Sequence, residues 1–393
     1  MLSSELKESF LSIIRLGIGH NAWHPYKEVD WPAIKALADR HGLSAIVLDG
    51  IDKCQSISKD SKETNISRIG ELEKSTRTNT NRSNCTNTIP LELKLEWIGE
   101  VLQEYEQRYE QYKRAIADLA GWHNDHGFKM MVLKGYACSL DWPKPEHRPC
   151  GDIDIWQFGK QKEADAALLN ENDNHNDNRF EIDNSHHHHT VYEWEGFTVE
   201  NHYDFLNVHH HKSNIELEKI LKELGQDDSH YDELYGEKVY LPSPNLHALF
   251  LLRHSMSNFA STGFKLRQLL DWGFFVENHT KEVDWTWLLD ILDRYGMKRL
   301  FQLFNAICVD DLGFDAGVFP TIIFLPALKD RVLNDILSPE FSEKEEGGFV
   351  SRAIFKFRRW RANAWKHELC FNESMTSAFW SGVKSHLLKP SSI

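Results

Sequence analysis

The segment Arg148-Pro-Cys-Gly-Asp-Ile-Asp-Ile-Trp156 constrains the fold more than any other stretch of the chain. Successive side chains of a β-strand point to opposite faces, so Asp152 and Asp154 share one face while Ile153 and Ile155 share the other. The isoleucines predict a strand anchored in a core, from which two carboxylates project together. Like charges this close repel each other unless a cation lies between them, and Mg²⁺ is the ion that one or two protein carboxylates suit best. The alternative is a turn that leaves both acids in solvent.

A short apolar run, Phe128–Leu133, precedes this segment and predicts another strand. Lys134-Gly135 follows it directly. A glycine between a strand and a helix lets a phosphate approach the backbone N–H groups at the helix N-terminus. The alternative is an ordinary turn that needs glycine for a positive φ, with Lys134 exposed.

A β-hairpin is predicted further along the chain. Thr190–Trp194 and Phe197–His202 have strand character, and Glu195-Gly196 between them is a two-residue turn. In the second strand Glu200 and His202 face the same way. Glu200 is therefore a third candidate carboxylate, although a lone glutamate in a strand is most often an exposed residue.

Two runs of histidine, His186–His189 and His209–His211, flank this second strand. Histidine is the commonest metal ligand, so the runs raise the alternative of a zinc protein. Neighbouring residues of a strand point to opposite faces, however, and consecutive histidines therefore cannot all converge on one ion.

Composition limits the class of protein. The 393 residues carry 59 acids against 45 bases, a formal charge of −14, which disfavours non-specific binding to DNA. The N-terminus lacks the apolar segment of a signal peptide, and no apolar run approaches the ~20 residues that span a bilayer. Few cysteines and no C-x-x-C pair indicate reduced thiols. We therefore expect a soluble, cytoplasmic protein without a membrane partner. The cysteines are Cys54, Cys85, Cys138, Cys150, Cys308 and Cys370.

The pattern along the chain predicts three regions. Residues 1–125 are expected to be helical, with a polar insertion at about 55–88; residues 126–242 hold the strands and the acids; residues 243–393 form a second helical domain. Within the last region a basic cluster, Arg352–Arg361, is interleaved with aromatic residues. It is either a solvated helix face or a surface for phosphate or acceptor.

Three motifs in this order resemble a known family: Val132-Leu-Lys-Gly135, Arg148-x-x-Gly-Asp-Ile-Asp-Ile155 and Val199-Glu-x-His202. They are similar to the uncharacterised nucleotidyltransferase family of the DNA polymerase β-like superfamily. The resemblance covers most of the chain outside the polar insertion. Its flanking features are Asp30-Trp31, Leu266–Asp271, Asp284-Trp285, Trp365–His367 and the final helix.

This resemblance implies an α+β fold with a nucleotidyltransferase-type mixed sheet, flanking helices and N- and C-terminal helical regions. It implies transfer of a nucleoside monophosphate from an NTP to an acceptor hydroxyl of a sugar, small metabolite, protein side chain or RNA end. Asp152, Asp154 and Glu200 would be the catalytic residues and the ligands of Mg²⁺ (or Mn²⁺), with His202 beside them. The implied nucleotide-binding residues are Lys134, Gly135, Arg148 and Gly151.

One departure from the superfamily pattern favours a further alternative. The usual glycine after the first strand is followed by Gly or Ser, whereas Gly135 is followed by Tyr136. Without the serine that would hold the terminal phosphates, the chain could be a degenerate module that binds nucleotide or metal without turnover.

Overall fold

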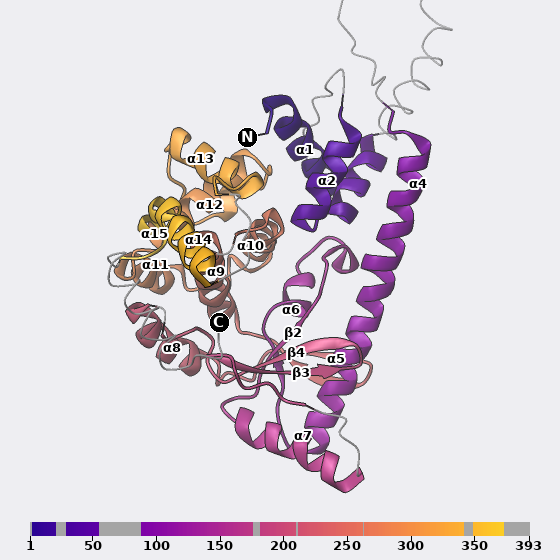
Figure 1. The fold of residues 1–393 in the computed structure, drawn as a ribbon, viewed down its shortest axis with the longest axis vertical. Coiled ribbons are helices and arrows are strands. Elements are labelled where there is room, and N and C mark those ends of the chain that lie inside the picture. The colour runs from indigo at the N-terminus through magenta and orange to yellow at the C-terminus, as the bar shows by residue number, and fades with distance from the viewer. Residues whose placement is uncertain are drawn as a thin grey trace, which may run out of the picture.

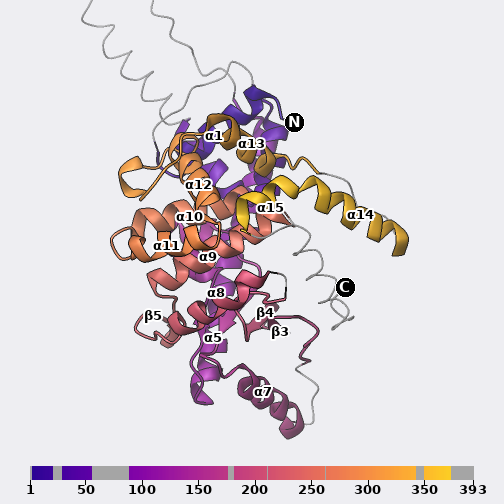
Figure 2. The same ribbon diagram turned by 90° about the vertical axis from the view of Figure 1, so that its left-hand side faces the viewer.

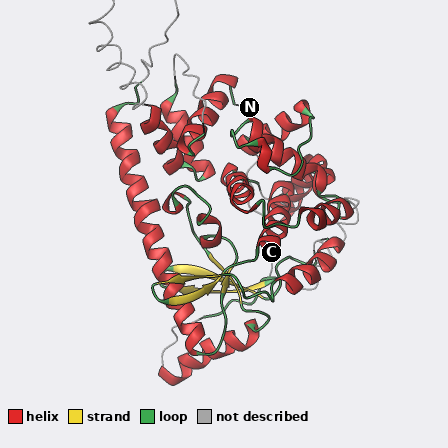
Figure 3. Cartoon of the chain, turned by 180° about the vertical axis from the view of Figure 1, so that it is seen from behind, coloured by secondary structure: helices red, strands yellow, loops and turns green. Residues whose placement is uncertain are grey.

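The computed structural model describes residues 2–20, 29–54, 88–175, 181–209, 211–261, 263–341 and 349–372. A single mixed sheet lies beside a larger mass of helices, seen from the front in Figure 1 and from behind in Figure 3. This arrangement confirms the predicted α+β fold class. The expected insertion at about 55–88 lies almost entirely outside the described residues, and so does the final helix. None of the described helices is both long and apolar enough to cross a bilayer.

The sheet has six strands in the order β3-β4-β2-β1-β6-β5. The predicted hairpin forms β3 and β4, and a second hairpin of β5 and β6 closes the other edge. The two strands that carry the acids are parallel neighbours. The strand bounds are β1 Met131–Val132, β2 Ile153–Trp156, β3 His189–Trp194, β4 Phe197–His202, β5 Tyr231–Leu234 and β6 Glu237–Tyr240.

The N-terminal helices include a long rod that runs down one side of the molecule and along the sheet (Figure 1). The rod consists of α4, a π-helical segment and α5, and its last part packs against β5 and β6. At the start of α2 the Asp30 carboxylate accepts a hydrogen bond from the Ala33 N–H at 3.0 Å, as expected of an N-cap. The bounds are α1 Ser4–Gly17, α2 Trp31–His41, a helix over residues 44–54, α4 Leu91–Glu100, the π-helical segment Val101–Gln107 and α5 Arg108–Asp125.

Of the remaining helices, α6, α8, α12 and α15 contact α9 or α10, whereas α7 lies on the other side of the sheet (Figure 1). Another, α14, projects away from the body of the molecule (Figure 2). Short helical turns lie at Pro145–His147 and Ala316–Val318. The bounds are α6 Tyr136–Ser139, α7 Gln161–His175, α8 Lys212–Leu224, α9 Pro244–Ala260, α10 Leu266–His279, α11 Trp285–Arg294, α12 Lys298–Asp310, α13 Pro326–Leu337, α14 Phe349–Ala362 and α15 Ala364–Cys370.

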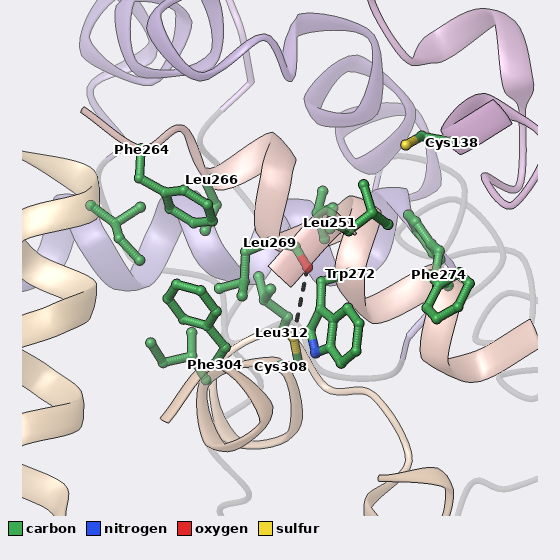
Figure 4. Packing of buried hydrophobic residues seen from close by; sticks show 14 of the residues in the cluster. Cys138, Leu251, Phe264, Leu266, Leu269, Trp272, Phe274, Phe304, Cys308 and Leu312 are labelled. Carbon is green, nitrogen blue, oxygen red and sulfur yellow. Dashed lines mark hydrogen bonds between the residues drawn. The ribbon is translucent and has the colours of Figure 1, made fainter. Parts of the chain in front are cut away.

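One large apolar core joins the N-terminal helices, one side of the sheet and the C-terminal helices. Figure 4 shows its centre, where Leu269 and Trp272 of α10 pack near Phe304 and Cys308 of α12. The Cys308 thiol lies 3.7 Å from the Leu269 carbonyl. Close packing of this kind leaves little room for movement, so it holds α10 in a fixed place beside the sheet.

Candidate functional site

A pocket of about 440 Å³ opens between the sheet and helices α9 and α10. Residues from the end of β1, from β2 and from β4 line one wall, and polar residues of the two helices line the other. Asp152, Asp154 and Glu200 all face this pocket.

The strand register explains why two of these acids meet. Strands β2 and β4 are parallel, and Asp154 and Glu200 are direct partners across the ladder. The Asp154 side chain is buried, whereas Glu200 is partly exposed and Asp152, which precedes β2, is exposed at the mouth. Although its side chain reaches solvent, partial desolvation by the pocket walls and the neighbouring Asp154 charge raise the pKa of Asp152.

Asp154 is held between two cationic groups. Its Oδ1 lies 2.6 Å from the Lys134 Nζ and 3.1 Å from the His202 Nε2. Burial alone would raise the pKa of Asp154, but Lys134 and His202 together hold that pKa well below its usual range. Burial disfavours the charge of Lys134, yet the acids around it raise its pKa. The ion pair is therefore fully charged at neutral pH.

His202 connects the two carboxylates. Its Nε2 faces Glu200 Oε2 at 3.6 Å as well as Asp154, and its Nδ1 lies 3.2 Å from the Asp204 carbonyl. Burial alone would lower the pKa of His202, but the two carboxylates raise it to about 9. For Glu200, burial acts to raise the pKa, and the contact with His202 lowers it below the usual value.

The turn after β1 requires glycine at position 135. Gly135 has a φ of 46°, and a Cβ at this position would lie 2.2 Å from the Tyr112 hydroxyl oxygen. That hydroxyl donates a hydrogen bond to the Asp152 carbonyl at 2.8 Å. The turn, Tyr112 and the acidic strand therefore form one tightly packed unit, and α6 begins directly after Gly135.

Arg148 lines the pocket, but Asp271 of α10 already binds its guanidinium. Nε and Nη2 contact the two carboxylate oxygens at 2.7 and 3.0 Å, and the Trp142 indole N–H donates to the same carboxylate at 2.9 Å. This fork lies in a buried position. Nucleotide binding by Arg148 and by the exposed Gly151 remains a prediction.

Sequence reasoning did not identify the cations that α10 contributes to the pocket. Lys265 and Arg267 both line it. Arg267 Nη1 donates to the Pro149 carbonyl at 3.1 Å, while its Nε is buried without a hydrogen-bond partner. Burial lowers the pKa of Arg267, and nearby Arg148 lowers it further. Arg267 interrupts the apolar pattern of Leu266–Asp271, and this interruption is the feature of the sequence that could have indicated a polar role.

The histidine runs meet at one point in the structure, where the ring centroids of His187 and His209 lie 5.3 Å apart. His188 and His189 approach His202, because His188 lies in a bend before β3 and the alternation of a strand does not apply to it. In the second run the His211 ring stacks on Phe371 with centroids 3.9 Å apart. None of the described residues that line the pocket belongs to α14, which carries the basic cluster.

The donor set fits a divalent cation. Ligand atoms of Asp154, Glu200 and His202 lie within 4.8 Å of one another. Carboxylate oxygens are the ligands that Mg²⁺ and Mn²⁺ prefer, and Asp152 at the pocket mouth adds another.

The model of a family described as uncharacterised nucleotidyltransferases matches residues 27–312. Among solved structures, an antigenic nucleotidyltransferase-like protein from Paracoccidioides brasiliensis matches with 17% sequence identity and a TM-score of 0.30. This match covers 43% of the present chain and 76% of the other. No curated protein matches the chain.

Proposed function

This chain belongs to the family of uncharacterised nucleotidyltransferases, and from that premise we propose that it transfers a nucleoside monophosphate from an NTP to an acceptor hydroxyl in the presence of Mg²⁺ or Mn²⁺. The observation that carries the proposal is the direct pairing of Asp154 and Glu200 across β2 and β4, above a pocket that Lys134 also lines.

The three acids would hold the metal. Asp152 and Asp154 offer oxygens from one strand segment, and Glu200 offers an oxygen from the next strand. A bound Mg²⁺ supplies neutralisation of the triphosphate charge and of the charge that develops during transfer. His202 keeps the carboxylates of Asp154 and Glu200 oriented, because its imidazole contacts both.

The proposed step is an in-line displacement. The acceptor oxygen forms a bond to the α-phosphorus, and the bond from that phosphorus to the β-phosphate oxygen breaks, so that pyrophosphate leaves. The hydroxyl proton passes to the ionised Glu200 or to water. Most of the rate in such a reaction comes from positioning and from the neutralisation of charge, which a rigid polar pocket supplies.

Local cations would receive the phosphates. Lys134 lies beside Asp154, and the same pocket is lined by Lys265, the N-cap of α10, and by Arg267 in its first turn. The chain carries a net charge of −14, so these cations offset repulsion that the metal alone would leave.

The Lys134–Asp154 ion pair also supports a second candidate function, a module that binds nucleotide without turnover. The Lys134 ammonium already contacts Asp154 Oδ1, an oxygen that a metal would need, and the superfamily's serine is absent after Gly135. A zinc protein built from both histidine runs has less support. The rings of His187 and His209 lie 5.3 Å apart, but the His211 ring stacks on Phe371, and the described residues whose ligand atoms converge include neither His209 nor His211.

Turnover tests the proposal. The full-length protein is incubated with Mg²⁺, a cell extract and each NTP labelled at the α-phosphate, and products are identified by mass spectrometry. We expect a labelled product and pyrophosphate, both abolished by Asp154→Asn. If NTP analogues bind to the wild type while no label moves from any NTP, the binding module is the correct function.

A further inference from the structure

Three imidazoles gather next to the carboxylates, and their arrangement goes beyond what nucleotidyl transfer requires. We propose that His188, His189 and His202, with Glu200 as fourth ligand, bind a divalent transition-metal ion of the Zn²⁺ or Co²⁺ kind. The proposal concerns ion binding by the folded chain and does not depend on transferase activity.

The backbone brings the three rings together. His189 and His202 are direct partners across β3 and β4. The His188 carbonyl accepts hydrogen bonds from the Tyr203 and Asp204 N–H groups at 3.0 and 3.1 Å, which fixes His188 over the end of β4. Ring centroids are 4.4 Å apart for His188 and His189, 5.5 Å for His188 and His202, and 5.2 Å for His189 and His202.

Two of the rings have nitrogen atoms that the protein leaves unpaired. His189 is 6% exposed, and both of its ring nitrogens are buried without a hydrogen-bond partner. The Nδ1 of His188 is also buried without a hydrogen-bond partner. A buried polar atom without a partner costs free energy, so such atoms on converging imidazoles indicate a ligand that the chain itself does not supply. A metal ion would use the free lone pairs.

His202 and Glu200 are placed as ligands of the same ion. The Nδ1 of His202 is satisfied by the Asp204 carbonyl at 3.2 Å, an arrangement typical of metal-binding histidines because it orients the other nitrogen. Metal binding would replace the contact that Nε2 now makes with Asp154 at 3.1 Å and would displace the proton on Nε2. Glu200 Oε2 lies 3.6 Å from His202 Nε2 and 3.9 Å from His189 Nδ1. One oxygen thus faces two imidazoles.

The spacing suits a small tetrahedral ion. The nitrogens of the three histidines lie within 4.8 Å of one another. Metal–ligand bonds of about 2.0–2.1 Å in a tetrahedron separate the ligand atoms by roughly 3.3–3.4 Å, so the ligand atoms need to approach one another by up to about 1.5 Å. Three nitrogens and one oxygen favour a borderline ion such as Zn²⁺ over Mg²⁺, which prefers oxygen. Donor chemistry therefore distinguishes this site from the Asp152–Asp154 pair.

Co²⁺ and Zn²⁺ binding tests the proposal directly. The full-length chain without an added histidine tag is stripped with a chelator, and Co²⁺ is titrated while its visible absorption is recorded; Zn²⁺ is then added in competition. We expect one Co²⁺ per chain with the intense bands of tetrahedral coordination, displaced by Zn²⁺. His189→Gln should weaken binding by at least about tenfold.

Matched variants separate this site from its surroundings. His186→Gln changes a ring in the same run whose Nε2 faces Asp183 at 3.5 Å, and it should bind Co²⁺ like the wild type. Asp152→Asn should also retain the tetrahedral spectrum, because Asp152 is not among the proposed ligands. Circular dichroism and melting temperatures show whether each variant is folded.

Two results would overturn the proposal. One is a folded wild type that gives no tetrahedral Co²⁺ spectrum. The other is a spectrum that His189→Gln and a folded His188→Gln variant both leave unchanged. Neither result bears on nucleotidyl transfer, which is measured with Mg²⁺ and NTP, so failure of the two proposals can be told apart.

Discussion

Asp154 keeps its negative charge in a buried position because two cationic side chains contact it. A buried carboxylate without partners would take up a proton, but Lys134 at 2.6 Å and His202 at 3.1 Å make the ionised form the stable one. As a result, the negative charge of the site is partly neutralised before any metal binds. Metal binding to Asp154 would therefore have to compete with Lys134, whereas Asp152 is exposed at the pocket mouth.

Mg²⁺ or Mn²⁺ is expected to raise the melting temperature of the protein. An ion that binds only the folded state, at 100 times its Kd, adds about 2.7 kcal/mol, which corresponds to a shift of a few degrees. Asp152→Asn and Asp154→Asn should each remove most of this shift, as followed by thermal denaturation with and without the ion. An equal shift in the wild type and in both variants would contradict the assignment of the acids.

Arg148 and Arg267 are expected to respond oppositely to substitution. Arg148→Lys replaces two buried hydrogen bonds to the Asp271 carboxylate by one. The free energy of unfolding should therefore fall by roughly 1–3 kcal/mol, with little change in nucleotide affinity. Arg267→Gln should weaken binding of a non-hydrolysable NTP analogue by about tenfold, since a charge-assisted hydrogen bond is worth about 1.5–3 kcal/mol.

Urea denaturation and calorimetric titration of both variants measure the two effects. If Arg148→Lys weakens binding of the NTP analogue tenfold and Arg267→Gln does not, then Arg148 binds the phosphates, as the sequence indicated.

These two arginines also mark the limit of prediction at the residue scale. The alternation around Asp154 is local, so a sequence of a few residues predicts which face the acids share. The partner of Arg148 lies 123 positions away in α10, and nothing in the local pattern names it. Asp271 in the apolar stripe of α10 indicates that a buried carboxylate has a cationic partner, but it does not indicate which residue that partner is.

At the scale of elements, the sequence predicted the strands better than their neighbours. The hairpin of β3 and β4 follows from its turn, because a two-residue turn fixes both partner and register. The pairing of β2 with β4 is parallel and crosses the intervening helix α7 and strand β3. Such a pairing depends on the packing of the whole sheet. The register of this pairing places Glu200 opposite Asp154, and the sequence alone does not predict it.

The turn after β1 is expected to tolerate no side chain. Gly135→Ala forces a Cβ to within 2.2 Å of the Tyr112 hydroxyl at a φ of 46°, and Tyr112 is fully buried and cannot move aside. The free energy of unfolding should fall by roughly 2–4 kcal/mol. Gly151→Ala is the control, because no atom lies within 4 Å of its added Cβ. Urea denaturation of both variants makes the comparison, and equal stabilities would refute this packing.

At the scale of the molecule, the N-terminal helices and the C-terminal helices pack on each other as well as on the sheet. His41 at the end of α2 makes one such connection. It accepts a hydrogen bond on Nδ1 from the Leu266 N–H at the start of α10, at 3.3 Å, and its Nε2 lies 3.4 Å from the Leu337 carbonyl at the end of α13. The ring therefore uses one nitrogen as donor and one as acceptor, which only the neutral imidazole can do.

The pH dependence of stability is expected to report this connection. Burial lowers the pKa of His41 from 6.5 to about 4, so between these values the unfolded chain binds a proton that the folded chain does not. Stability must then fall as the pH drops from about 6.5 to about 4, with a slope that approaches 1.4 kcal/mol per pH unit for one proton. His41→Gln retains a donor and an acceptor but takes up no proton. The difference in unfolding free energy between wild type and variant, measured by urea denaturation from pH 7 to pH 4, should therefore change with this slope. A constant difference across the range would mean that the folded and unfolded chains bind the His41 proton equally well, which would refute the hydrogen bond from the Leu266 N–H to a neutral ring.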